Sequence, residues 1–364
     1  MALTDKLDHY QRTHRWAAFP IAVIYKFVDD QGSYLSALIT YYAFLGFFPL
    51  LLLASSILGF VLQGNPDLQA QILDSALSQF PVIGEQLRRP GGLQGSGTAV
   101  IIGIVGSLYG GLGVAQATQN AMNTAWGVPR NKRPNPIAAR LRGLLLLVTA
   151  GLGIVGTTLL SALGSEVDAF GAQIGSGLQM VLSVAAVLLN AGIFVLLFRL
   201  ATTHKHSLKR AVPGALVSAV VLQLLQQVGT TYVEHVIKNA SVTDSVFAFV
   251  LGLIAWIYLS AVIVVFSVQI NVVKAHRLYP RALLTPFTDN VDLTAGDQRA
   301  YTDYAEATRS KDFQSVKVSF EHDGQYATAK RRARERGSVD DDGDGDPPST
   351  QDTETRTEKP HKHY

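Results

Sequence analysis

The chain has 364 residues, 48% of them hydrophobic, and its 31 Lys and Arg slightly outnumber its 28 Asp and Glu. It contains no cysteine, which excludes a disulfide framework, thiolate catalysis and a cysteine-ligated metal site. The hydrophobic residues gather into long uncharged runs, and these runs decide the fold class.

Six apolar runs are each about long enough to cross a hydrocarbon layer of ~30 Å. Before residue 274 there are 16 Lys and Arg and 11 Asp and Glu, and none of them falls inside a run. An ionised side chain at the bilayer centre costs at least about 2.5–3.5 kcal/mol, whereas the helices of a soluble protein carry charges on their outer faces. The sequence therefore predicts an all-α, polytopic membrane protein with six transmembrane helices, at about residues 33–62, 98–125, 143–164, 178–198, 211–232 and 246–273.

Basic residues are unevenly distributed among the segments that join these runs. The leader and the second and fourth loops hold 13 Lys and Arg, whereas the first, third and fifth loops hold three. Because basic residues collect in cytoplasmic loops, this bias predicts that both termini lie in the cytoplasm. An even number of spans also requires the two termini to lie on the same side.

The transmembrane domain, residues 33–273, follows a leader that we expect to be cytoplasmic, residues 1–32. The leader has apolar residues at helical spacing, followed by Gly32 just before the first span. This pattern predicts an amphipathic helix lying in the membrane interface, with an apolar stripe opposite Arg15 and Lys26 that consists of Trp16, Phe19, Val23, Ile24 and Phe27.

The first outer loop is long and also has a helical pattern. Asn65 is a helix cap, Pro66 stands at the first helical position, and Pro81 bends or ends the helix. One face carries Leu68, Ile72, Ala76 and Phe80. We expect an interfacial amphipathic hairpin that either rests on the outer membrane surface or covers a cavity.

The tail, residues 274–364, holds 15 Lys and Arg and 17 Asp and Glu, more than half of all the charges in the chain. Its low-complexity blocks from about residue 330 onward cannot bury a core, so we expect this part of the cytoplasmic tail to be largely disordered. Just after the last span, we expect Lys274, Arg277 and Arg281 to lie against anionic lipid head groups.

No motif in the sequence predicts catalysis, a metal or a cofactor. Asp340, Asp342 and Asp344 match the start of a calcium loop, but position 12 would be Gln351, which cannot supply the bidentate carboxylate. The histidine pairs at 204/206 and 361/363 lack a third ligand and an acid. "GLGIVG" at 151–156 lies inside a span, where its glycines favour close helix packing over dinucleotide binding.

Amide side chains are the informative polar groups within the spans. In hydrocarbon each amide needs a partner, so amide-bearing faces point inward, where they either join helices by hydrogen bonds or line a polar cavity for a substrate or lipid head group. The second span carries Gln116, Gln119, Asn120 and Asn123 on one face, and the fifth carries Gln223, Gln226 and Gln227. The candidate cavity lining is Tyr41, Gln116, Asn120, Asn123, Asn190, Gln223, Gln227 and Gln269.

Pro49 lies in the middle of the first span, in "YYAFLGFFPLLLLASSILGFVL". It leaves the carbonyl of Leu45 without its usual donor, so we expect a helix kink there. With Gly46 beside it, the kink is either a hinge or static geometry. Tyr41 and Tyr42 precede it near the cytoplasmic entrance of the span.

Four segments resemble the YihY family, which includes virulence factor BrkB and was once labelled ribonuclease BN. "SALITYYAFLGFFPLLL" is similar to the first span of that family, and "GLGVAQATQNAMNTAWGVPRNKRP" to the end of its second. "VPGAL" resembles the start of its fifth span and "LIAWIYLSAVIVVFSVQINVV" its last. The resemblance covers roughly residues 15–285, and the sequence after the last span suggests an actinobacterial branch.

The resemblance implies a multi-pass protein of the bacterial plasma (inner) membrane with six helices and no settled biochemical activity. Gln269 stands where the family commonly has an acidic residue, a departure that argues against a proton-coupled role. We therefore expect a non-enzymatic protein without a cofactor or nucleic-acid partner, which contacts membrane lipids and binds or transports a lipid or amphipathic small molecule. The alternative is a non-transporting envelope assembly or scaffold protein, and a nuclease ranks third.

Overall fold

The structure is a computed structural model that describes residues 2–61, 97–169, 176–204, 207–232, 242–283 and 291–320. The chain divides into two compact units, Met1–Val318 and Ser319–Tyr364, and the second lies almost wholly outside the described residues. Three predictions fall outside the described residues: the amphipathic hairpin around residues 65–89, the histidines at 206, 361 and 363, and the disordered tail beyond residue 330.

The described part of the first unit consists of helices and connecting segments, without a strand. In chain order the α-helices are α1 (Ala2–Thr13), α2 (Arg15–Asp29), α3 (Gly32–Val61), α6 (Gly97–Ala125), α7 (Pro136–Ala169), α8 (Ser176–Ala201), α9 (Leu208–Tyr232), α10 (Val242–His276) and α11 (Ala295–Ala307). Six of them are long and apolar enough to cross a membrane: α3, α6, α7, α8, α9 and α10. The predicted fold class, an all-α polytopic membrane protein with six spans, is confirmed.

The surfaces of these six helices are apolar. Ile101 and Val105 on α6, Leu152 on α7 and Phe247 on α10 are each at least 65% exposed. A soluble monomer rarely exposes contiguous apolar surface on this scale, whereas a lipid bilayer is its natural solvent. The exposed faces are therefore those that we expect to contact lipid.

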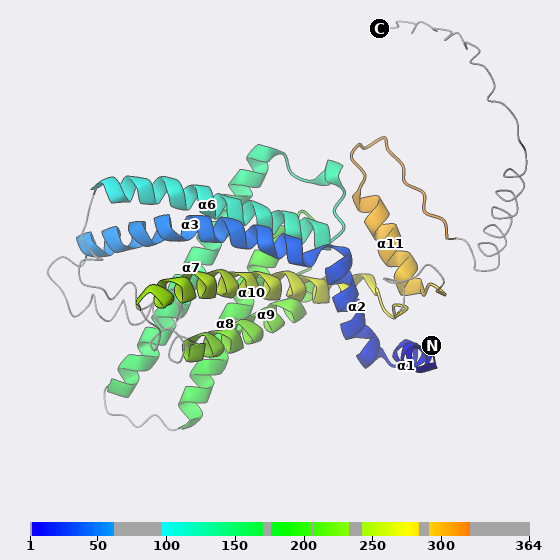
Figure 1. The fold of residues 1–364 in the computed structure, drawn as a ribbon, viewed down its shortest axis with the longest axis horizontal. Coiled ribbons are helices and arrows are strands. Elements are labelled where there is room, and N and C mark those ends of the chain that lie inside the picture. The colour runs from blue at the N-terminus through cyan, green and yellow to red at the C-terminus, as the bar shows by residue number, and fades with distance from the viewer. Residues whose placement is uncertain are drawn as a thin grey trace, which may run out of the picture. The chain divides into compact units, whose positions relative to one another are not determined.

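The best-packed part of the first unit is the end of the bundle where α3 begins and α10 ends, here called the base. Figure 1 shows α1, α2 and α11 gathered at this end. The largest core cluster lies there and joins α2, α6, α8, α9 and α10 through residues that include Val23, Met122, Phe198, Ala215 and Val272. The base is thus a packed layer that holds α6, α8, α9 and α10 together at one end.

Along the spans, α3 and α6 form a closely packed pair (Figure 1). Gly46 of α3 faces Gly110 of α6, and a Cβ added at Gly110 would overlap the Cα of Gly46. The ring of Pro49 packs on Gly106, where an added Cβ would lie 2.6 Å from Pro49 Cβ. Small residues permit this approach of two backbones, and Gly106 and Gly110 have the four-residue spacing that is typical of such contacts.

The leader is helical, and α2 packs Phe19, Val23 and Phe27 of the predicted stripe into the protein core. Trp16 and Ile24 are 69% and 50% exposed, whereas Ala18, Ala22, Val23 and Lys26 are buried. The buried face packs against α10. Lys26, which we expected opposite the stripe, is buried because Asp30 neutralises its charge, so its side chain lies in the base instead of facing water.

The segment after the last span is also more structured than its composition indicates. The α11 helix begins with a capping box, in which the Thr294 side chain accepts from the Asp297 backbone N–H and the Asp297 side chain accepts from the Thr294 backbone N–H. Arg281, which we expected at lipid head groups, is buried because its guanidinium pairs with Asp297 at 2.5 Å and with Asp29 at 3.1 Å. Lys274 and Arg277 are exposed.

Candidate functional site

The amides of α6 hold the two basic loops at the base. Asn120 Oδ1 accepts a hydrogen bond from Arg133 Nη1 at 2.7 Å. Asn123 Oδ1 accepts from the backbone N–H and the hydroxyl of Thr203, both at 2.9 Å, and from the Thr202 hydroxyl at 3.2 Å. These amides have protein partners and therefore fix the loops that follow α6 and α8.

The two amides of α10 join other elements to that helix. Gln269 Nε2 donates to Asp30 Oδ2 at 2.9 Å. Asn271 Oδ1 accepts from the backbone N–H of Gly214 at 2.8 Å, and Asn271 Nδ2 donates to the carbonyl of Ala211 at 3.2 Å.

Pro213 has no N–H and its ring interrupts the first turns of α9, so Asn271 bonds backbone groups on both sides of the interruption. Two of the segments that carry the family resemblance, "VPGAL" and the end of the last span, meet here.

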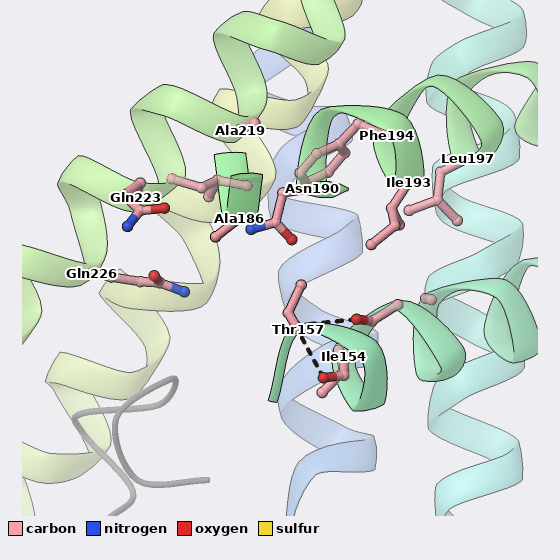
Figure 2. Close-up of a pocket in the computed structure, with 13 residues that line it drawn as sticks. Ile154, Thr157, Ala186, Asn190, Ile193, Phe194, Leu197, Ala219, Gln223 and Gln226 are labelled. Atoms are coloured by element: carbon pink, nitrogen blue, oxygen red, sulfur yellow. Dashed lines mark hydrogen bonds between the residues drawn. The ribbon is translucent and has the colours of Figure 1, made fainter. Parts of the chain in front are cut away.

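A cavity of about 350 Å³ lies among α7, α8 and α9. Asn190 of α8 and Gln223 and Gln226 of α9 carry their amide groups into this space, and Thr157 of α7 lies beside it (Figure 2). α8 packs against both α7 and α9, which hardly touch each other, so the cavity occupies the space between them. Its remaining walls are small or apolar: Ala150, Gly153, Ile154, Ala186, Ile193, Phe194, Leu197, Ala219 and Leu222.

Asn190 and Gln223 differ from the other buried amides in lacking a protein partner. Neither makes a hydrogen bond to a described residue, and both are half-buried. The Thr157 hydroxyl is engaged with its own helix and donates to the carbonyls of Gly153 and Ile154 at 3.1 and 3.0 Å. An amide in an apolar medium without a partner costs several kcal/mol, so these two require water or a ligand.

The structure thus separates the predicted lining residues into two sets. Asn190 and Gln223 line the cavity, together with Gln226 of the same predicted face. Asn120, Asn123 and Gln269 lie elsewhere with the partners given above. Tyr41 is exposed, and its ring lies edge-on to that of Tyr42. Gln116 and Gln227 are also exposed. Pro49 lies within the continuous helix α3 and packs against α6.

A buried polar cluster at the base was not predicted from the sequence. Lys26 Nζ lies 2.5 and 2.6 Å from the two carboxylate oxygens of Asp30, which also accepts from Gln269. Burial raises the pKa of Asp30, against the opposing effect of Lys26. The spacing of Lys26 and Asp30, four residues apart, is the only signal in the sequence for this pair.

Aromatic and histidine side chains form a second cluster at the base. The rings of Trp126 and His204 are stacked at 4.8 Å, and His276 Nδ1 lies 2.7 Å from Asp303 Oδ2. His204 therefore packs on an aromatic ring at the base. Across the described residues, no three His, Asp or Glu side chains gather in a group that could hold a metal ion.

The fold and the sites define an integral membrane protein of six apolar helices with a polar base and one amide-bearing cavity among the pockets described. Residues 23–289 match the family of virulence factor BrkB, and the chain belongs to that family. The matched range runs from α2 through the last span to the segment that carries Arg281, so it includes the cavity and most of the base.

Two relatives share low but extended similarity with the chain. The ribonuclease-like protein YfkH of Bacillus subtilis (strain 168) is 22% identical over 259 residues, which are 69% of this chain and 93% of that protein. The inner membrane protein YhjD of Escherichia coli (strain K12) is 22% identical over 268 residues, which are 66% of this chain and 76% of that protein. No solved structure matches the chain. The family predicted from the sequence segments is confirmed.

Proposed function

We propose that this protein is a non-enzymatic component of the bacterial plasma membrane that binds or transports a lipid or another amphipathic small molecule through the cavity among α7, α8 and α9. The observation that carries the proposal is the pair of amides, Asn190 and Gln223, which line the cavity without a hydrogen-bond partner among the described residues. The name of YhjD as an inner membrane protein supports the location.

The chemistry of the walls supports an amphipathic ligand. Nine of the 13 lining residues are small or apolar, and the four polar ones are Thr157, Asn190, Gln223 and Gln226. Binding sites for small molecules commonly combine such walls with a few polar groups that fix orientation. The volume of about 350 Å³ lies at the lower end of the range for ligand pockets, roughly 300–1,000 Å³.

The position of the amides along their helices supports a site within the bilayer. Asn190 is 11 residues from the end of α8 at Ala201, and Gln223 is nine residues from the end of α9 at Tyr232. At 1.5 Å per residue these spacings correspond to about 16 and 14 Å, so a ligand there would enter from the membrane rather than from solution.

The alternative function, a scaffold that transports nothing, is supported by the amides of α6 and α10. Gln119, Asn123, Gln269 and Asn271 all bond to another element of the protein, as purely structural amides would. This alternative explains the hydrogen-bonded amides of the base. It does not explain why Asn190 and Gln223 line the cavity without a partner among the described residues. A nuclease remains the third hypothesis, and the ribonuclease-like name belongs to YfkH.

The experiment is to fill the cavity with a side chain. Ala186→Phe adds a ring to the cavity wall, and Val184→Phe adds the same ring two residues away on the same helix at a position that is 49% exposed. Each protein is reconstituted into vesicles, and the movement of fluorescent lipid analogues between leaflets is measured. We expect Ala186→Phe to abolish movement and Val184→Phe to leave it unchanged. Equal activity of the two variants, or a wild type without activity, would favour the scaffold.

A further inference from the structure

We infer that the ligand of this cavity is an uncharged lipid whose polar end carries hydroxyl groups, of the chemical class of a diacylglycerol, and that a phosphate does not enter the cavity. The inference rests on the proposed function and concerns the group that Asn190 and Gln223 contact.

The residues that line the cavity carry no charge. Arg199 is nine residues from Asn190 along α8, and Arg210 is 13 residues from Gln223 along α9. With a rise of 1.5 Å per residue, these distances are about 14 and 20 Å. A phosphate in the cavity would therefore lose its hydration without gaining a cation from a described lining residue, which is strongly unfavourable.

Amide groups are complementary to hydroxyl groups in their hydrogen bonding. Each carboxamide offers two N–H donors and a carbonyl acceptor, and a hydroxyl group both donates and accepts. Asn190 and Gln223 come from different helices and reach the same space (Figure 2), so they are placed to bond neighbouring hydroxyl or ester oxygens of one ligand. The Thr157 hydroxyl donates to the carbonyls of Gly153 and Ile154 in its own helix.

The size of the cavity fits the polar head of such a lipid but not its acyl chains. A volume of about 350 Å³ equals that of about a dozen water molecules in the liquid, enough for a glycerol-sized head but not for two acyl chains. Ile154, one of the lining residues on α7, is 46% exposed. Because α7 and α9 hardly touch each other, the acyl chains would leave between them and remain among the lipids.

The test compares two fluorescent lipids with the same acyl chains, a diacylglycerol and a phosphatidic acid. Each is titrated against the full-length protein in detergent micelles, for the wild type, Asn190→Leu, Gln223→Leu and Gln116→Leu. Gln116 is exposed outside the cavity and provides a control for the loss of an amide. We expect the diacylglycerol to bind at least tenfold more tightly than the phosphatidic acid. Each cavity substitution should weaken its binding about fivefold, as expected for one lost hydrogen bond, and Gln116→Leu should not.

The outcomes separate this inference from the proposed function. Equal or tighter binding of phosphatidic acid that still depends on Asn190 and Gln223 would overturn the ligand class and leave the cavity as the binding site. Binding of either lipid that ignores both amides would overturn the inference and the proposed function together. Failure of the diacylglycerol to bind would also overturn the inference. Thermal melts of each variant show whether the protein is folded.

Discussion

Gly46 and Gly110 bring α3 and α6 into direct backbone contact, because neither residue carries a side chain between the two helices. A Cβ at Gly110 would overlap the Cα of Gly46. Pro49 extends the same contact to Gly106. The region around Pro49 is therefore packed against a partner helix.

Gly110→Ala is expected to destabilise the protein by about 1–3 kcal/mol, the usual cost of overpacking, because the two helices must separate. Gly151→Ala is the matched control, since an added Cβ there meets nothing within 4 Å. That control should be neutral or slightly stabilising, because alanine favours a helix more than glycine does. The measurement is thermal unfolding in detergent, and equal melting temperatures for the two variants would contradict the close contact of α3 with α6.

The second prediction concerns the buried pair of Lys26 and Asp30. Lys26→Met leaves a buried carboxylate without its cation, and Asp30→Asn leaves a buried ammonium without its anion, so each should cost roughly 3–5 kcal/mol. The double variant removes both charges and should recover most of that loss. Unfolding of all four proteins in a double-mutant cycle measures the coupling, and purely additive effects would show that the two side chains do not pair.

The third prediction concerns pH. Burial raises the pKa of Asp30 above its usual value of 3.8, although Lys26 and the hydrogen bond from Gln269 act in the opposite direction. The folded state therefore binds the proton of the Asp30 carboxyl group more tightly than the unfolded chain does. The stability that this proton contributes falls as pH rises from about 3.8 through the raised pKa. Asp30→Asn cannot bind the proton.

The stability of the wild type relative to Asp30→Asn should consequently decline as pH rises through that window and then remain constant. Melting temperatures of both proteins from about pH 4 to pH 8 provide the measurement. A relative stability that increases with pH would mean that Lys26 outweighs burial and that the pKa of Asp30 is lowered.

The prediction from the sequence that both termini are cytoplasmic leads to a labelling experiment. Because the chain has no cysteine, a single introduced thiol gives a signal without background. A cysteine at Lys132, exposed between α6 and α7, should react with an impermeant thiol reagent only after the membrane is opened. A cysteine at Gln94, between the first two predicted spans, should react in intact cells. The reverse pattern would invert the topology.

The fold could be predicted from the sequence because lipid imposes one simple rule, the exclusion of charge from the spans. The contact of Gly106 and Gly110 with another helix could also be predicted, since small residues at this spacing permit close approach. Gly151 and Gly156 show the limit of that rule, because no neighbouring atom lies within 4 Å of an added Cβ at either position.

The base and the cavity depend on partners that are distant in sequence. The buried Arg281 side chain pairs with Asp29, which lies 252 residues earlier, and no local pattern in the sequence indicates such a pair. Gln223 and Asn123 look alike in the sequence, since each is an amide on an inward helix face. Only the arrangement of α7, α8 and α9 shows that Gln223 meets a cavity, whereas Asn123 meets the Thr203 backbone.

The most direct test of the central claim is the thermal unfolding of Asn190→Leu and Asn123→Leu, each beside its binding of the fluorescent diacylglycerol. Asn123 has partners in Thr202 and Thr203, so its replacement should lower the melting temperature and reduce binding only in proportion to the folded fraction. Asn190 has no described partner, so its replacement should leave the melting temperature level or raise it while binding falls about fivefold. If Asn190→Leu lowers the melting temperature and the remaining folded protein binds as well as the wild type, the amide is structural and the cavity is not the binding site.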